Sequence, residues 1–190
     1  MYLILDTEPI GLPWNFKAPF TDTDNWPRMV WLGFILLDEN GEIVREGYYY
    51  VNPNVEIPVN ITRIFGVSTE MVFKYGNSMV DILHILQTVV KKSKYIIGHN
   101  VEFDYKIISA EIVRNKAAFS LKRKKRICTM HSSREFCNLR IINGKYITPK
   151  LTELYQKLFN KELLAETTRE DVRATAKCFW ELKSSGIIKI

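Results

Sequence analysis

The chain opens with an uninterrupted apolar run, Tyr2-Leu3-Ile4-Leu5, which is followed at once by Asp6-Thr7-Glu8. A strand with one face in water alternates apolar and polar side chains, whereas this run has no polar member. The sequence therefore predicts a strand over residues 2–5 that is buried on both faces in the middle of a sheet. Its two acidic residues are expected at the edge of that buried sheet.

The next segments supply antiparallel neighbours for this strand. Residues 9–27 contain four prolines together with Gly11 and several Asn and Asp residues, which predicts a long loop. Two β-rich runs then follow over residues 29–37 and 43–51, and the Asn40-Gly41 pair between them is a strong hairpin signal. Three antiparallel strands are therefore expected to open the fold.

The second half of the chain alternates strand and helix patterns. Apolar residues at helical spacing run from Met79 to Val90 after a short helix over 69–75 that Ser68 can cap. Further elements are predicted as a strand at Tyr95–Gly98, a helix over about 101–115, a last strand at Ile127-Cys128-Thr129, a helix opened by Thr148-Pro149, and a final helix over about 168–184. The expected fold is α/β: a mixed sheet of five strands with helices on both faces.

Size and composition narrow the context. A chain of 190 residues predicts one domain over residues 1–190. The net charge of +6 is compatible with a polyanionic partner, although proteins without one also carry such an excess. The three cysteines have no CxxC pair, which favours reduced thiols over a disulfide framework. Since no apolar run approaches the roughly 20 residues of a membrane span, no membrane contact and a cytoplasmic location are expected.

Asp6 and Glu8 stand two residues apart, so their side chains leave the same face of the predicted strand. Two acids at the edge of a buried sheet repel each other. A bound divalent cation would offset the repulsion, and hard oxygen ligands suit magnesium or manganese. The alternative for an Asp-x-Glu pair alone is a solvated strand end that leads into a turn.

Two later acids lie on predicted helices. Asp104 is four residues after Asn100, where a strand passes into a helix, so an amide and an acid would share one helix face. Asp171 lies at the margin of a small, apolar stripe on the final helix, where a carboxylate needs a partner. Either acid could instead be a solvated first-turn charge that the helix dipole favours.

Three motifs together resemble the exonuclease motifs of the DEDD superfamily, the DnaQ-like exonucleases. They are Leu5-Asp6-Thr7-Glu8, then Gly98-His99-Asn100 with Phe103-Asp104, then Asp171-Val172 followed by Ala174-Thr175. Connecting pieces such as Ile64-Phe65-Gly66-Val67 extend the resemblance over nearly the whole chain. The resemblance implies an RNase H-like fold and stepwise hydrolysis of nucleic acid from its 3′ end, with release of nucleoside monophosphates.

Carried onto this sequence, the resemblance implies a catalytic site with two Mg²⁺ or Mn²⁺ ions. Asp6 would bridge both ions, Glu8 and Asp171 would complete one site, and Asp104 would hold the other ion largely through water. Two-metal catalysis is the chemistry that such a set of carboxylates supports.

The same resemblance implies a substrate and its contacts. Single-stranded DNA or a frayed 3′ end is expected, with RNA left open, and Ile10, Asn100 and Phe103 would hold the terminal base and sugar. The sequence does not identify a polymerase or repair partner.

One departure from the family concerns the general base. In the histidine branch a histidine lies five residues before the last aspartate, a position that Glu166 fills here; the tyrosine branch would place its residue at Thr167. Thr167 and Glu170 instead fit a capping box. A glutamate with an ordinary pKa near 4.3 is a weaker base than histidine at neutral pH, so reduced activity or a lower pH optimum is expected. The alternative is a nucleic-acid-binding relative that has lost efficient catalysis.

Three further features bear on substrate binding. Pro9 removes a backbone donor directly after Glu8, which affects the expected grip on the 3′ end. The basic run at 122–126 could bind phosphates, but more often such a run is a solvated loop. The long loop carries Trp14, Phe16, Phe20 and Trp26. These aromatic residues could stack on single-stranded bases, although loop aromatics usually pin a loop to the body of the protein.

Overall fold

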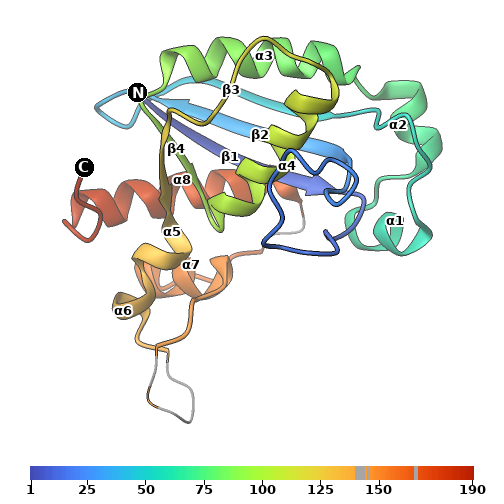
Figure 1. The fold of residues 1–190 in the computed structure, drawn as a ribbon. Coiled ribbons are helices and arrows are strands. Elements are labelled where there is room, and N and C mark those ends of the chain that lie inside the picture. Colours follow the sequence, from blue (N-terminus) through green and yellow to red (C-terminus); the bar gives the residue numbers. More distant parts are fainter. Residues whose placement is uncertain (140–143, 145, 165–166) are drawn as a thin grey trace.

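A computed structural model describes residues 1–139, 144, 146–164 and 167–190 of the chain, and its centre is one five-stranded sheet (Figure 1). The strands are β1 (Tyr2–Pro9), β2 (Met29–Leu37), β3 (Ile43–Tyr50), β4 (Tyr95–Gly98) and β5 (Lys125–Cys128). Their order across the sheet is β3-β2-β1-β4-β5. The pairs among β1, β2 and β3 are antiparallel, and β4 and β5 join in parallel, so the predicted mixed sheet is confirmed.

Helices cover both faces of this sheet, as the sequence predicts. Those of the described residues are α1 (Val59–Phe65), α2 (Thr69–Tyr75), α3 (Met79–Lys92), α4 (Val101–Arg114), α5 (Thr129–Ser132), α6 (Arg134–Cys137), α7 (Leu151–Phe159) and α8 (Thr168–Ser184). One core cluster joins α3 and α4 to one face, and a second joins α7 and α8 to the other. None of the described helices has the length and apolar character to cross a membrane.

Strand β1 is buried on both faces. Leu3 and Leu5 belong to the cluster under α3 and α4, while Ile4 belongs to the cluster under α8, and all three are fully buried. Burying one such side chain contributes roughly 1.5–3 kcal/mol. The apolar run at the start of the chain therefore fixes β1 at the centre of the fold.

The structure extends β1 beyond its predicted end at Leu5. Its pairing with β2 continues through Glu8↔Trp31 and Pro9↔Met29, whereas its parallel pairing with β4 stops at Ile4↔Ile97. Asp6 and Glu8 therefore lie inside a strand, on the stretch of β1 that runs past its neighbour β4. The pairing with β2 holds their backbone in place.

Several element boundaries follow local hydrogen bonds. The predicted cap of α2 is present, because Ser68 Oγ accepts from Met71 N. Ser78, which was not predicted as a cap, caps α3 in the same way by accepting from Asp81 N. The prediction that Thr148-Pro149 opens α7 is wrong. The helix begins at Leu151, two residues after Pro149. Lys150 is its N-cap, and the backbone N–H of Lys150 donates to the Glu153 carboxylate at 2.7 Å.

The last strand and one helix also differ from the sequence-based expectation. Thr129 begins α5 instead of ending β5, which stops at Cys128 where its partner β4 stops at Gly98. Helix α1 was not predicted from the sequence, because its seven residues include only one buried side chain, Ile61, and so lack an apolar stripe. The three cysteines are free thiols.

Candidate metal centre

Three carboxylates meet where β1 runs past β4. Asp6 and Glu8 come from one face of β1, and Asp171 comes from the first turn of α8, which packs on that face. Each offers an oxygen that lies within 4.8 Å of the other two. The reciprocal capping box between Thr167 and Glu170, which the sequence predicts, fixes where α8 begins and hence where Asp171 lies.

Asp104 reaches this region from the opposite face of the sheet. It lies in the first turn of α4, is almost fully buried, and its Oδ1 accepts hydrogen bonds from the backbone N–H of Thr7 at 3.1 Å and from Thr7 Oγ1 at 2.8 Å. Thr7 stands between Asp6 and Glu8, so its side chain leaves the other face of β1. The residue between the two acids thus ties the fourth acid to the same strand.

The electrostatics of the cluster are unfavourable for four charged carboxylates. Burial raises the pKa of Asp6 well above its usual value, and the charges of Asp104, Glu8 and Asp171 raise it further. Burial, then Asp104 and Asp171, raise the pKa of Glu8 to about 8, although a hydrogen bond from Thr168 opposes the shift. Asp104 therefore raises the pKa of both acids of β1.

The other two acids are shifted in the same direction. Burial raises the pKa of Asp104 to about 7 against the two hydrogen bonds from Thr7, which favour its charged form. Burial and then the neighbouring Glu170 raise the pKa of Asp171. Since two of the four values lie near neutral pH, the cluster requires protons or cations to relieve its repulsion.

The donor set fits a hard divalent cation. Asp6 Oδ2 is the buried side-chain oxygen that has no hydrogen-bond partner within the part of the chain that the structure describes. Leaving such an oxygen unpaired is costly, and a carboxylate-rich group is the usual ligand set for Mg²⁺ or Mn²⁺. The ion pairs formed by described residues involve Glu46, Glu102 and Glu111, and none neutralises this cluster.

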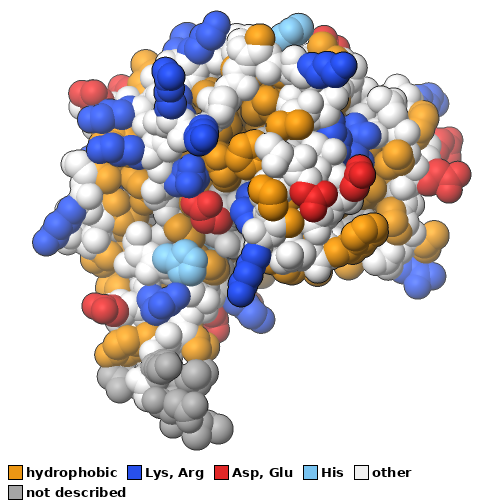
Figure 2. Space-filling view, viewed as in Figure 1, with side chains coloured by type: hydrophobic (Ala, Val, Ile, Leu, Met, Phe, Trp, Pro, Cys, Tyr) orange, Lys and Arg blue, Asp and Glu red, His pale blue; other side chains and the backbone are white. Residues whose placement is uncertain are grey.

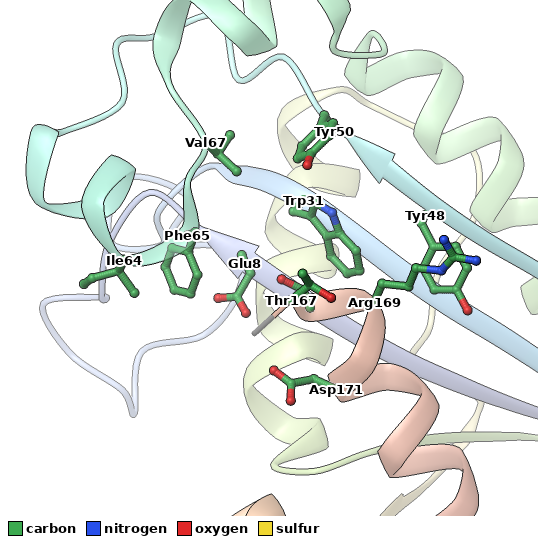
Figure 3. A pocket seen from close by; sticks show the side chains of 11 residues that line it. Glu8, Trp31, Tyr48, Tyr50, Ile64, Phe65, Val67, Thr167, Arg169 and Asp171 are labelled. Atoms are coloured by element: carbon green, nitrogen blue, oxygen red, sulfur yellow. The ribbon is translucent and has the colours of Figure 1, made fainter. Parts of the chain in front are cut away.

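A cavity of about 380 Å³ opens beside the cluster (Figure 3). The carboxylates of Glu8 and Asp171 border it, and aromatic side chains from β2, β3 and α1 line its other side. They are Trp31, Tyr48, Tyr50 and Phe65. The aromatic wall suits a flat ring, whereas the acidic rim suits a phosphate only with a cation between them.

The remaining predicted site residues differ in their burial. Ile10 is half-buried against the cluster of Val30, Ile57, Ile61, Val67 and Val72. Phe103 is half-buried on α4. Asn100 is exposed and precedes α4 as its N-cap in the left-handed region (φ 85°), so it does not share the helix face of Asp104 as predicted. Glu166 lies outside the described residues.

Three residues near the centre are not singled out by the sequence, and His99 is assigned a structural role by it. Thr7 could have been identified, because strand alternation sends it away from Asp6 and Glu8 toward α4. Trp31 and Arg169 carry no sequence motif, and only the pairing of β1 with β2 and the packing of α8 bring them to the cavity. His99 has the structural role expected of it, with Nδ1 3.0 Å from Thr129 Oγ1 and Nε2 3.0 Å from the Pro149 carbonyl oxygen.

The basic run at 122–126 is partly used within the fold. Lys124 Nζ donates to the Ser93 carbonyl, and Arg126 forms an ion pair with Glu102 and lies over the ring of Tyr105. Lys125 and Arg126 belong to the edge strand β5. The run is therefore a solvated loop only at its start.

Comparison with known protein sequences finds exonucleases. The family model with the description "Exonuclease" (RNase_T) matches residues 3–179. The chain is similar to the 3′–5′ exonuclease DinG of Bacillus subtilis (strain 168), with 28% identity over 144 residues. That match covers 76% of this chain and 14% of DinG, so the chain spans only a small part of that relative.

Similar solved structures share the fold. Escherichia coli exonuclease I in complex with a dA16 oligonucleotide superposes with a TM-score of 0.73 and 18% identity, over 96% of this chain and 40% of that one. A zinc-bound form of the same enzyme with single-stranded DNA gives 0.72. Exonuclease X in complex with 5′ overhanging duplex DNA gives a TM-score of 0.62 and 19% identity, over 98% of this chain and 93% of that one. The RNase H-like α/β fold implied by the sequence motifs is thereby confirmed.

Proposed function

Because the chain belongs to the exonuclease family whose model covers residues 3–179, as its resemblance to the DnaQ-like exonucleases predicts, we propose that it hydrolyses nucleic acid from the 3′ end. The proposed substrate is single-stranded DNA or a frayed 3′ end, and the products are nucleoside 5′-monophosphates. The observation that carries the proposal is the group of Asp6, Glu8 and Asp171 at the rim of the sheet. All three motifs lie around one sheet, which supports a single exonuclease domain over residues 1–190.

The proposed roles of the acids follow from their positions. Asp6 would be the ligand shared by two cations, Glu8 and Asp171 would complete one site, and Asp104, the most buried of the four, would face the other. Two divalent cations there would supply activation of water and neutralisation of charge on phosphorus. The chain's own contribution is to fix these oxygens through the β1–β2 pairing, the α8 cap and the Thr7–Asp104 bonds.

The cavity beside Glu8 and Asp171 supports a nucleotide as the ligand. Trp31 and Phe65 offer apolar surface to a base or sugar, while Ile10, Asn100 and Phe103 remain the proposed contacts implied by the family. The solved structures of exonuclease I and exonuclease X are complexes with DNA, which supports DNA as the polymer. Arg169 lines the same cavity and offers a cation for a phosphate.

We propose Glu166 as the group that accepts a proton from the attacking water, in place of the family's histidine. Substituting Glu166→His should raise turnover near neutral pH and move the pH optimum upward, because imidazole titrates near 6.5. Glu162→His, which changes an exposed glutamate on the same segment, is the matched control. Equal turnover in the wild-type protein and Glu166→His would defeat this assignment.

A second function is favoured by the missing histidine. Under this alternative the chain binds metal and polymer but hydrolyses poorly. The two functions differ in metal-dependent release of monophosphates, which only the nuclease produces at a useful rate.

The deciding experiment uses single strands of DNA and RNA that carry a label at either end. With Mg²⁺ or Mn²⁺, the 3′-labelled strand should release labelled monophosphate at once, while the 5′-labelled strand shortens stepwise. Asp6→Ala should abolish both signals. Release of monophosphate from the 5′ end, or equal rates for wild type and Asp6→Ala, would refute the proposal.

A further inference from the structure

The four aromatic residues of the loop between β1 and β2, residues 10–28, divide into two pairs. Trp26 is 2% exposed and donates its indole N–H to the Pro19 carbonyl at 3.1 Å. Phe20 packs edge-on against Tyr105 of α4, with ring centroids 5.8 Å apart. These two side chains pin the loop to the body of the protein, as loop aromatics usually do.

The rest of the loop is held by polar contacts. Arg28 Nε donates to Glu111 Oε1 at 2.9 Å, and Arg114 donates to the same carboxylate and to the carbonyls of Thr23 and Trp26. The tip is closed by Asn15 and Asn25, since Asn15 N–H donates to Asn25 Oδ1 at 2.8 Å and Asn25 Nδ2 donates back to the Asn15 carbonyl at 3.0 Å.

Trp14 and Phe16 flank this closed tip and remain outside. Trp14 is 89% exposed and Phe16 56% exposed, and Leu12, two residues earlier, is 70% exposed. Burying a large apolar side chain would stabilise the fold, so a fixed loop that leaves a tryptophan in water forgoes that stabilisation. Exposed aromatic residues on a fixed loop are typical of a binding surface.

This surface reaches the helix that carries Asp104. Phe16 lies against Phe103, with ring centroids 6.3 Å apart, and Phe103 directly precedes Asp104. Trp14 is six residues after Glu8, a span of at most about 20 Å of chain. In Figure 1 the loop leaves the end of β1 and passes α4.

Positive charge accompanies the aromatic rings. Lys106 Nζ donates to the Phe16 carbonyl at 2.6 Å and lies 4.9 Å from the Trp26 ring centroid, and the exposed Lys17 follows Phe16 in the chain. Figure 2 shows this face, on which lysine and arginine side chains lie beside exposed hydrophobic ones, with acidic side chains among them. Aromatic rings interleaved with cations suit single-stranded nucleic acid, whose bases stack and whose phosphates are negative.

We propose that Trp14 and Phe16 form a stacking platform for the bases of a single strand a few nucleotides from the 3′ end bound at the metal centre. This inference rests on the proposed function and adds to it a binding surface for the strand away from the acids. Because every base has a π-face, the platform would be tolerant of sequence. Its role is to hold the strand between successive cleavage steps.

The test measures binding of a 16-nucleotide, 5′-labelled oligo(dT) by fluorescence anisotropy, in an Asp6→Asn background that leaves the strand intact. Trp14→Ala and Phe16→Ala should each raise Kd by about 5-fold to 150-fold, the equivalent of roughly 1–3 kcal/mol per stacked base. Trp14→Phe should retain most of the affinity, whereas Trp14→Leu should lose it. Tyr75→Ala, which removes a 66% exposed aromatic ring on α2, is the control and should bind like the background protein.

Three outcomes would overturn the platform. Equal affinity of Trp14→Leu and the background protein would show an apolar contact without stacking. Loss of self-association in Trp14→Ala, with oligonucleotide binding unchanged, would show that the surface binds a second copy of the chain. No measurable binding by the background protein would exclude a strand altogether.

A separate readout distinguishes failure of this inference from failure of the proposed function. Suppose that the protein without the Asp6→Asn substitution releases monophosphates and that Trp14→Ala in this protein leaves the KM for long strands unchanged. The stacking platform is then refuted, while the proposed nuclease function is retained. If strand binding depends on Trp14 but the wild-type protein releases no monophosphate with metal, the nuclease fails and the strand-binding surface stands.

Discussion

Glu111 and Asp6 both place carboxylate oxygens inside the fold, and the chain surrounds them with opposite charges. Glu111 on α4 is fully buried, and its Oε1 accepts from Arg28 Nε at 2.9 Å, from Arg114 Nη1 at 2.9 Å and from the backbone N–H of Met29 at 3.2 Å. A carboxylate with two guanidinium partners is complete within the chain. This pairing joins α4 to the start of β2 and to the loop before it.

Asp6 has the reverse environment. The charges that act on it come from Asp104, Glu8 and Asp171, all of the same sign as its own. Its Oδ2 lacks a hydrogen-bond partner within residues 1–139, 144, 146–164 and 167–190. Among the described residues, no lysine or arginine forms an ion pair that relieves this repulsion.

The difference separates a carboxylate that the chain itself neutralises from one that it leaves among like charges. Where the chain supplies the counter-charge, as at Glu111, burial of an acid serves stability. Where the chain supplies further acids, as at Asp6, the missing charge is expected from outside, and a divalent cation is the natural source. Substitutions at the two positions should therefore have opposite effects on stability and activity.

The largest expected effect is that of Asp6→Asn on hydrolysis. Loss of the shared ligand should reduce turnover of single-stranded DNA by on the order of 10³-fold or more, since the cations provide several kcal/mol of charge stabilisation. The same substitution should raise the Tm of the metal-free protein, because a neutral amide removes repulsion. Turnover in Mg²⁺ and Tm in EDTA measure the two effects; a lower Tm in EDTA would mean that Asp6 is structural.

Glu111→Gln should have the opposite result. Removing the charge leaves Arg28 and Arg114 without their shared partner, which should destabilise the fold by about 3–5 kcal/mol, the usual effect of breaking a buried ion pair. Urea denaturation monitored by circular dichroism gives this free energy of unfolding. The matched control is Glu102→Gln, at the exposed ion pair with Arg126, which should cost about 1 kcal/mol or less. Similar losses for both variants would contradict the contrast.

Thr7→Val tests the link between the cluster and the sheet. Loss of the hydroxyl removes the 2.8 Å hydrogen bond to Asp104 Oδ1 while the backbone N–H bond remains, so activity should fall by about 10–100-fold, as for other groups that orient metal ligands. Thr7→Ser should restore most of the activity. Full activity of Thr7→Val at limiting Mg²⁺ would show that Asp104 needs no such support.

A smaller effect is expected from pH in the absence of metal. The pKa of Glu8 is raised to about 8 and that of Asp104 to about 7, so their stabilising contribution is present below about pH 4 and is lost as pH rises through these values. The Tm in EDTA should therefore fall by a few degrees between pH 5 and pH 8, because about 1 kcal/mol shifts Tm by roughly 2–4 °C in a chain of this size. Asp6→Asn should show a shallower fall; a parallel fall would assign the effect to other groups.

Much of the fold follows from local sequence patterns. The apolar run at residues 2–5 and the stripe from Met79 to Val90 each predict a burial pattern that the structure reproduces. The Asn40-Gly41 pair predicts a hairpin, and β2 and β3 pair antiparallel on either side of it. Helix α1 and the start of α7 were missed because their boundaries depend on tertiary contacts and on the Glu153 side chain.

The sequence singles out the acids of the candidate site but not the residues around them. Asp6, Glu8, Asp104 and Asp171 stand out because acids beside buried elements are rare and match family motifs. The Thr7–Asp104 bonds and the aromatic wall beside Glu8 arise from pairing and packing between distant segments, which spacing in the sequence does not encode. The division of the loop aromatics into pinned and exposed pairs was likewise visible only in the structure.

The most direct measurement is the thermal stability of three proteins, with and without saturating Mn²⁺. A ligand that binds the folded state at a hundred times its Kd stabilises it by about 2.7 kcal/mol. Wild type and Glu111→Gln should gain equal increments in Tm from the metal, although Glu111→Gln begins lower, and Asp6→Asn should gain little. An unchanged wild-type Tm in Mn²⁺, or the same gain in Asp6→Asn, would contradict a cation site at the rim of β1.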